Sequence, residues 1–107
     1  MSASAPDIAV HPERADEAAG VLKALAHPLR MRICAYLACK GEMCVGELAV
    51  RLGVPQPIVS QQLRILRGHA LVGVSRREGH AFYRVTDPLV ERLLRCMEGC
   101  SHGRAKE

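Results

Sequence analysis

The sequence contains no tryptophan, and only two tyrosines and one phenylalanine occur among its 107 residues. A core without many aromatic rings must be built from leucine, valine, isoleucine, alanine and methionine, which favours helices. No stretch approaches the roughly 18 consecutive apolar residues of a membrane span. The first residues also lack the basic and apolar regions of a secretory signal. We therefore expect one compact domain, no membrane partner and a cytoplasmic location.

Patterns typical of enzymes are also missing: there is no Cys-x-x-Cys pair, no βαβ pattern, and no evident Ser/His/Asp or paired-carboxylate arrangement. A thiol enzyme or a metal carrier is thus a remote alternative, and no cofactor is required. The cysteines are odd in number, which fits a closed disulfide framework poorly and leaves open metal binding, regulated redox chemistry or plain packing. They are Cys34, Cys39, Cys44, Cys96 and Cys100. The scattered histidines, among them His27, are expected to cap helices or lie at the surface.

Positive charge is concentrated in about a third of the chain. The formal net charge is +4, and all of that excess lies between Gln56 and Thr86, where five arginines accompany one acid, Glu78. Such a localised excess is typical of a protein that binds a polyanion. A solvated charged face without a partner would give the same count.

Hydrophobic spacing and helix-ending residues predict five helices and one hairpin in a domain over residues 12–100. A disordered tail over residues 1–11 and a flexible tail over 101–107 flank it. Helices are expected over 12–26, 28–40, 45–52, 56–68 and from Pro88 to about Gly99, and strands over 71–77 and 81–85. The order α-α-α-α-β-β-α, mainly α with a β-hairpin, is typical of a winged helix-turn-helix.

The helix over 56–68 and the hairpin carry the side chains expected to contact DNA. Glutamine and arginine make bidentate contacts to base edges in the major groove, and serine suits bases or phosphates. Basic residues around the hairpin turn fit the phosphate backbone or the minor groove. The candidate DNA contacts are Gln56, Ser60, Gln61 and Arg64 on the helix and Arg76, Arg77 and His80 on the hairpin.

Three segments covering roughly residues 20–86 resemble the ArsR (arsenic repressor) family of dimeric bacterial winged-helix repressors: LKALAHPLRMRI, GEMCVGELAVRLGVPQPIVSQQLRIL and LVGVSRREGHAFYRV. The resemblance implies a homodimer formed by the first and last expected helices, a palindromic double-stranded operator with half-sites about one helical turn apart, and release of DNA by a small inorganic inducer. Apolar Leu89, Val90, Leu93 and Leu94 on the last helix fit such an interface. Pro55 stands where the family has a Ser or Thr cap, which predicts a late start for the following helix.

The resemblance is strongest to the branch that senses reactive sulfur, and it makes Cys34 and Cys100 the favoured switch thiols. In that branch a persulfide on one thiol is attacked by the other, and the resulting polysulfide bridge moves the dimer off DNA. Nearby Arg30, Arg32 or Arg95 is expected to lower the pKa of the attacking thiol. An end of the last helix at Gly99 would leave Cys100 free to reach Cys34.

A repressor that responds to arsenite or another soft metal is the alternative, with Cys44, Cys96 and Cys100 as the metal-binding thiols. Cys44 matches the first thiol of that branch's Cys-Val-Cys pair, whereas Gly46 replaces the second. A third possibility is that Cys96 and Cys100 simply continue an apolar helical stripe with Leu89 and Leu93. Cys39 is interpreted as a bystander.

Overall fold

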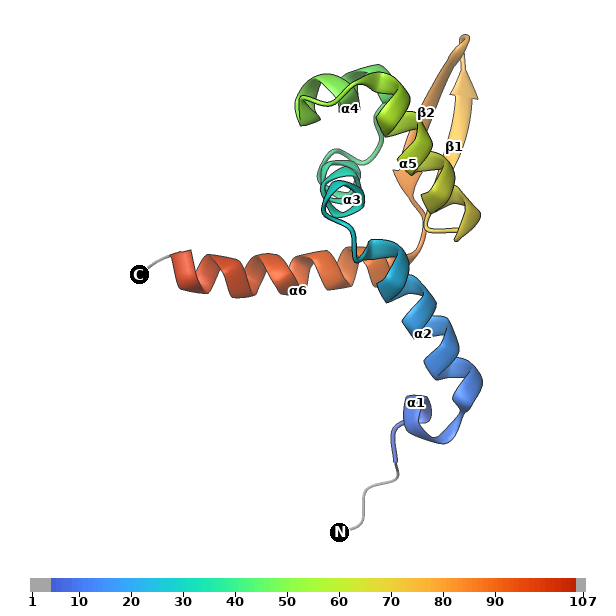
Figure 1. The fold of residues 1–107 in the computed structure, drawn as a ribbon, viewed down its shortest axis with the longest axis vertical. Coiled ribbons are helices and arrows are strands. Elements are labelled where there is room, and N and C mark those ends of the chain that lie inside the picture. The colour runs from blue at the N-terminus through green and yellow to red at the C-terminus, as the bar shows by residue number, and fades with distance from the viewer. Residues whose placement is uncertain (1–4, 106–107) are drawn as a thin grey trace.

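The computed structural model describes the backbone of residues 5–105 and the side chains of residues 5–98. The elements are α1 (Asp7–Val10), α2 (Pro12–Leu25), α3 (Pro28–Lys40), α4 (Val45–Leu52), α5 (Gln56–Gly68), β1 (Val72–Arg77), β2 (His80–Val85) and α6 (Pro88–Ala105). Helices α3, α4 and α5 pack together beside the hairpin, while α2 and α6 extend away from them in different directions (Figure 1). The winged helix-turn-helix expected from the sequence is confirmed.

The helix-turn-helix corner depends on two local features. Gly53 ends α4 in the left-handed region (φ 68°, ψ 36°), which glycine adopts without a steric penalty. Helix α5 then begins at Gln56, directly after the extended Pro55. The late start expected after Pro55 is therefore wrong, because the backbone N–H groups of the first turn need no intrahelical partner and Pro57 fits there.

The hairpin turns tightly at Glu78 and Gly79, whose φ angles of 53° and 80° are typical of a two-residue turn between antiparallel strands. The strands pair from Val72 opposite Val85 to Arg77 opposite His80. A short third segment joins them, because Met43 and Tyr83 exchange backbone hydrogen bonds of 3.0 and 2.8 Å. A single bridging pair has no periodic signature, so the sequence did not predict it.

The core lies where α3, α4, α5 and the hairpin meet. Its fully buried members include Ile33, Leu37, Leu48, Leu63 and Leu66, and no polar or charged residue is buried among those described. His27 caps α3, since its Nδ1 accepts a hydrogen bond from the N–H of Leu29 at 3.2 Å. This confirms the capping role expected for a histidine.

The two ends of the chain depart from the predicted tails. Within the described part of residues 1–11, α1 forms one helical turn, in which Asp7 lies at the favourable N-terminal position. At the other end α6 continues through Gly99 to Ala105, past the boundary expected at residue 100. Glycine inside a helix costs only about 1 kcal/mol relative to alanine, so one glycine need not end it.

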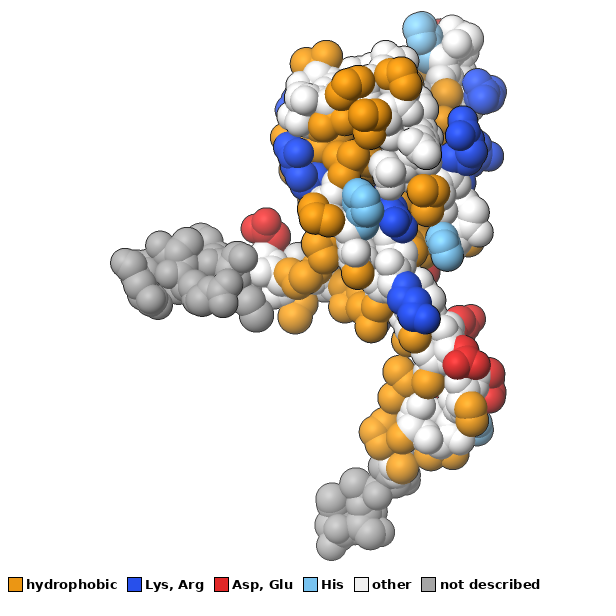
Figure 2. All heavy atoms as spheres, viewed as in Figure 1, with side chains coloured by type: hydrophobic (Ala, Val, Ile, Leu, Met, Phe, Trp, Pro, Cys, Tyr) orange, Lys and Arg blue, Asp and Glu red, His pale blue; other side chains and the backbone are white. Residues whose placement is uncertain are grey.

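Helices α2 and α6 give the protomer an open shape. The Cα radius of gyration is 16.1 Å, larger than the roughly 13 Å expected for a compact domain of this length. Figure 2 shows hydrophobic side chains along the sides of α2 and α6 that face into the angle between these helices. Among residues 5–105, no helix combines the length and apolar character that a membrane crossing requires.

Candidate nucleic-acid interface and thiol sites

The outer face of α5 presents polar side chains to solvent. Val59, Leu63 and Leu66 anchor the helix in the core, and Gln61 and Arg64 are exposed on the opposite face. A helix fixed by three buried side chains holds its outward residues in a defined direction, as reading base edges requires. Two further candidates complete the set: Gln56 is exposed in the first turn and Ser60 is half-buried.

The hairpin lies beside α5 and carries a cluster of exposed positive charge (Figure 2). Arg76 and His80 are exposed at the end of the hairpin, next to the turn. Arg77 differs from them, because its guanidinium donates to the Glu42 carboxylate at 2.6 Å and lies 4.2 Å from the centre of the Phe82 ring. The hydrogen bond from Arg77 lowers the pKa of Glu42.

Two exposed residues on this surface were missed by the sequence analysis. Arg84 lies on the outward face of β2, where it donates a 3.0 Å hydrogen bond to Ser75 Oγ; strict alternation along the strand would have identified it. Ile58 is 43% exposed near the start of α5. An apolar side chain at this place suits the C5-methyl group of thymine.

Cys34 is fully buried in the core. Burial raises the pKa of its thiol to about 11, so for Cys34 the lowered pKa expected from neighbouring arginines is wrong. Those arginines are engaged elsewhere in the described structure. Arg30 donates to the carbonyl of Ala24 at 2.9 Å, Arg32 to the carbonyl of Leu52 at 3.4 Å, and Arg95 to the carboxylate of Glu91 at 2.8 Å.

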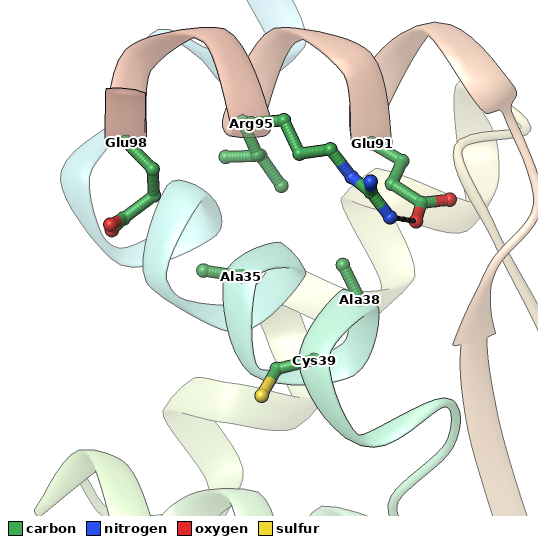
Figure 3. A pocket seen from close by; sticks show the side chains of 7 residues that line it. Ala35, Ala38, Cys39, Glu91, Arg95 and Glu98 are labelled. Carbon is green, nitrogen blue, oxygen red and sulfur yellow. Dashed lines mark hydrogen bonds and ion pairs between the residues drawn. The ribbon is translucent and has the colours of Figure 1, made fainter. Parts of the chain in front are cut away.

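A groove of about 420 Å³ lies between α3 and the middle of α6, beside the place where the two helices pack together. Ala35 and Ala38 face the α6 side chains across it, whereas Cys39 lies farther from α6 (Figure 3). The groove is formed by Ala35, Ala38, Cys39, Glu91, Leu94, Arg95 and Glu98. Because these alanine side chains are small, they leave space between α6 and α3, the helix that also carries Cys34.

The remaining cysteines lie at the start of α4 and on α6. Cys44 is half-buried immediately before α4, and Cys96 is exposed on α6. Cys100 belongs to the backbone of α6, but its side chain lies outside the described residues. Among side chains that the structure describes, no group of three Cys, His, Asp or Glu residues comes together as metal ligands do.

Comparison with known proteins finds relatives over most of the chain. A family model described as a helix-turn-helix domain matches residues 25–74. The biofilm growth-associated repressor of Xylella fastidiosa is 39% identical over 85 residues, which cover 79% of this chain and 74% of that protein.

Two solved structures are similar along nearly the whole chain. The AntR antimony-specific transcriptional repressor matches with a TM-score of 0.84 and 26% identity, covering 99% of this chain and 100% of that one. A homodimeric winged helix-turn-helix DNA-binding domain from Mycobacterium bovis, named as a possible ArsR-family transcriptional regulator, matches with a TM-score of 0.75 and 27% identity. The match covers 99% of this chain and 94% of the Mycobacterium bovis chain.

Proposed function

The chain belongs to the ArsR family of winged helix-turn-helix transcriptional repressors, and from this premise we propose that it is a homodimer that binds a palindromic operator and releases it when cysteine thiols react. The protein is a regulator and not an enzyme. The observation that carries the proposal is the arrangement of α5, whose Gln61 and Arg64 are exposed beside a hairpin with a cluster of positive charge.

Dimerisation is supported by the apolar surface of α1, α2 and α6. Four of the six large, well-exposed hydrophobic side chains among the described residues lie there, and we call these four the arm surface: Ile8, Val10, Leu22 and Met97. Exposed apolar patches of this kind mark interfaces. Val90, in contrast, is fully buried within the protomer, so its expected role in the interface is wrong. The relative from Mycobacterium bovis is homodimeric.

We expect Leu22→Glu to raise the dimer dissociation constant by roughly 100-fold or more, because a two-fold interface contains each substitution twice and each leucine loses its apolar burial. Sedimentation equilibrium measures the constant. Val50→Glu is the matched control, since Val50 is 81% exposed on α4, outside the arm surface. Leu22→Glu protein that sediments like wild type would contradict the proposed interface.

Footprinting tests the DNA-binding part of the proposal. A dimer with two copies of α5 should protect two half-sites whose centres lie about 34 Å, one helical turn, apart. We expect hydroxyl-radical footprints of this spacing in DNA upstream of the protein's own gene. A single protected stretch without two-fold symmetry would argue against the dimeric arrangement.

For the inducer we propose reactive sulfur species acting through Cys34 and Cys100. One thiolate attacks a polysulfide, which breaks an S–S bond, leaves two or more sulfur atoms on that cysteine and expels the shortened sulfide fragment. The second thiolate then attacks this bound chain next to its terminal sulfur, which closes a polysulfide bridge and releases hydrosulfide. Support comes from the packing of α3 against α6, the two helices that carry these cysteines. Because Cys34 is buried, bridging requires local opening between α3 and the core, which would alter the spacing of the two recognition helices.

Substitution of either thiol should block release. We expect tetrasulfide to weaken operator binding of the wild-type protein by at least about tenfold, and to leave Cys34→Ser and Cys100→Ser protein bound. Cys39→Ser is the control and should respond as wild type does, because the exposed Cys39 has no part in the bridge. Release of Cys34→Ser protein by tetrasulfide would refute the thiol pair.

The likeness to the antimony-specific AntR repressor favours a second candidate, in which a trivalent metalloid is the inducer. Its thiolate ligands would be Cys96 and Cys100 with a third cysteine, of which Cys44 is the candidate. Arsenite would then release Cys34→Ser protein from DNA but would leave Cys96→Ser protein bound. For the polysulfide bridge we expect the reverse with tetrasulfide: Cys34→Ser protein stays bound, and Cys96→Ser protein is released.

A further inference from the structure

The outer face of the hairpin contains an ion pair that joins two parts of the fold. Arg77 lies in the last position of β1, next to the turn. Its guanidinium extends over the Phe82 ring of β2, 4.2 Å from the ring centre, and reaches Glu42 with N–O distances of 2.6 and 3.4 Å. Both nitrogens of the guanidinium fork therefore contact the two oxygens of one carboxylate.

Glu42 is held in place by the backbone on either side of it. Gly41 ends α3 with a φ of 93°, and Met43 forms the two backbone hydrogen bonds to Tyr83. The Glu42 carboxylate is therefore fixed beside the hairpin, and its bond to Arg77 connects the end of α3 to the tip of the hairpin.

The same contacts distinguish Arg77 from its neighbour Arg76. Arg76 is exposed, and none of the side-chain hydrogen bonds or ion pairs of the described residues engages it. Arg77 already has a carboxylate partner and an aromatic face. A phosphate contact by Arg77 would have to replace the Glu42 bond.

We propose that Glu42 and Arg77 form a latch that fixes the hairpin relative to α3, so that Arg77 is a positioning residue for DNA binding rather than a phosphate contact. The proposal rests on the DNA-binding function proposed above. It assigns a role to Glu42, an acid whose negative charge would otherwise only oppose DNA binding.

The sign of the effect of Glu42→Gln separates the latch from plain electrostatics. Removing a negative charge near DNA strengthens binding if charge alone matters. Loss of the latch instead weakens binding, by up to about fivefold for each hairpin and up to roughly 25-fold for a dimer with two. Glu47→Gln is the matched control. This substitution removes the same charge from α4, but among the described residues Glu47 pairs only with Arg51 of its own helix and does not join α3 to the hairpin.

The dependence of operator affinity on salt concentration, measured by fluorescence anisotropy, also distinguishes a positioning role of Arg77 from a phosphate contact. We expect Arg77→Gln to weaken operator binding without changing the salt dependence, since no phosphate contact is lost. The charge-reversed double variant Glu42→Arg/Arg77→Glu should recover most of the affinity. A loss of about two units of salt slope in the Arg77→Gln dimer, or tighter binding by Glu42→Gln, would overturn the latch and make Arg77 a phosphate contact.

Amide hydrogen exchange on the DNA-free protein tests the latch independently of the proposed function. Hairpin amides of Glu42→Gln protein should exchange faster than those of Glu47→Gln protein. Equal rates would overturn the latch even if DNA binding is normal. Conversely, wild-type protein without operator preference would refute the proposed function, whereas faster exchange in Glu42→Gln would still support the latch.

Discussion

Alanine at Gln61 or Arg64 is expected to remove most of the preference for operator over unrelated DNA. Both side chains are exposed on the face of α5 opposite its buried residues. A good bidentate contact to a base edge contributes about 1–3 kcal/mol of discrimination. A palindrome contains each contact twice, so Arg64→Ala should weaken specific binding by roughly 30-fold or more.

The matched control for Arg64→Ala is Arg67→Ala. Arg67 is also exposed on α5 and carries the same charge, but it lies one turn closer to the C-terminal end. We expect its substitution to weaken binding to operator DNA and to scrambled DNA by the same factor, because the lost charge contacts DNA of any sequence equally. Competition titrations with both DNAs measure the ratio. An operator preference that survives both Gln61→Ala and Arg64→Ala would exclude α5 as the reading helix.

Alkaline conditions are expected to destabilise the wild-type protein more than Cys34→Ala protein. The pKa of Cys34 is about 11 in the folded state because the buried thiolate would lose its hydration. In the unfolded chain the thiol ionises near its ordinary value, about two units lower. The folded state therefore holds a proton that the unfolded state has lost, and its stability falls as pH rises between about 9 and 11.

The size of this loss follows from the two-unit difference in pKa, which corresponds to about 2–3 kcal/mol by pH 11. Urea unfolding of both proteins from pH 7 to 11 measures this loss: the free energy of unfolding should fall more steeply with pH for the wild type than for Cys34→Ala protein. Cys39→Ala is the control, since an exposed thiol gives no such difference. Parallel curves for wild type and Cys34→Ala would show that the thiol ionises freely in the folded protein.

The raised pKa also bears on the sensing role that we propose for Cys34. Only the thiolate is nucleophilic, so a pKa of about 11 leaves roughly one thiol in ten thousand ionised at pH 7. In the proposed bridge, Cys100 is therefore expected to react first, and Cys34 to attack during local opening of α3. The proposed switch would therefore depend on conformational opening as much as on thiol chemistry.

The helices and the hairpin were predictable because their signals are local. A glycine such as Gly53 is typical of the end of a helix, and the spacing of Val59, Leu63 and Leu66 indicates one apolar face of α5. The same spacing placed Gln61 and Arg64 outward. These features need no knowledge of contacts between distant parts of the chain.

Contacts between distant residues could not be predicted. Nothing near Arg77 in the sequence indicates a partner 35 positions away in Glu42, and the bridge between Met43 and Tyr83 has no periodic pattern. The burial of Cys34 was missed for a similar reason. Arg30 and Arg32, which are close to Cys34 in sequence, donate instead to the carbonyls of Ala24 and Leu52, so sequence proximity overstated their effect on its pKa.

The most direct test of the proposed repressor is the affinity of the fully reduced protein for its own upstream DNA, measured by fluorescence anisotropy against a scrambled duplex of equal length and composition. We predict at least about a thousandfold preference for the upstream DNA at physiological salt. Subsequent addition of tetrasulfide should release the complex, and arsenite should leave it intact. Equal, strongly salt-dependent binding to both duplexes would contradict the assignment of this chain as an operator-binding repressor.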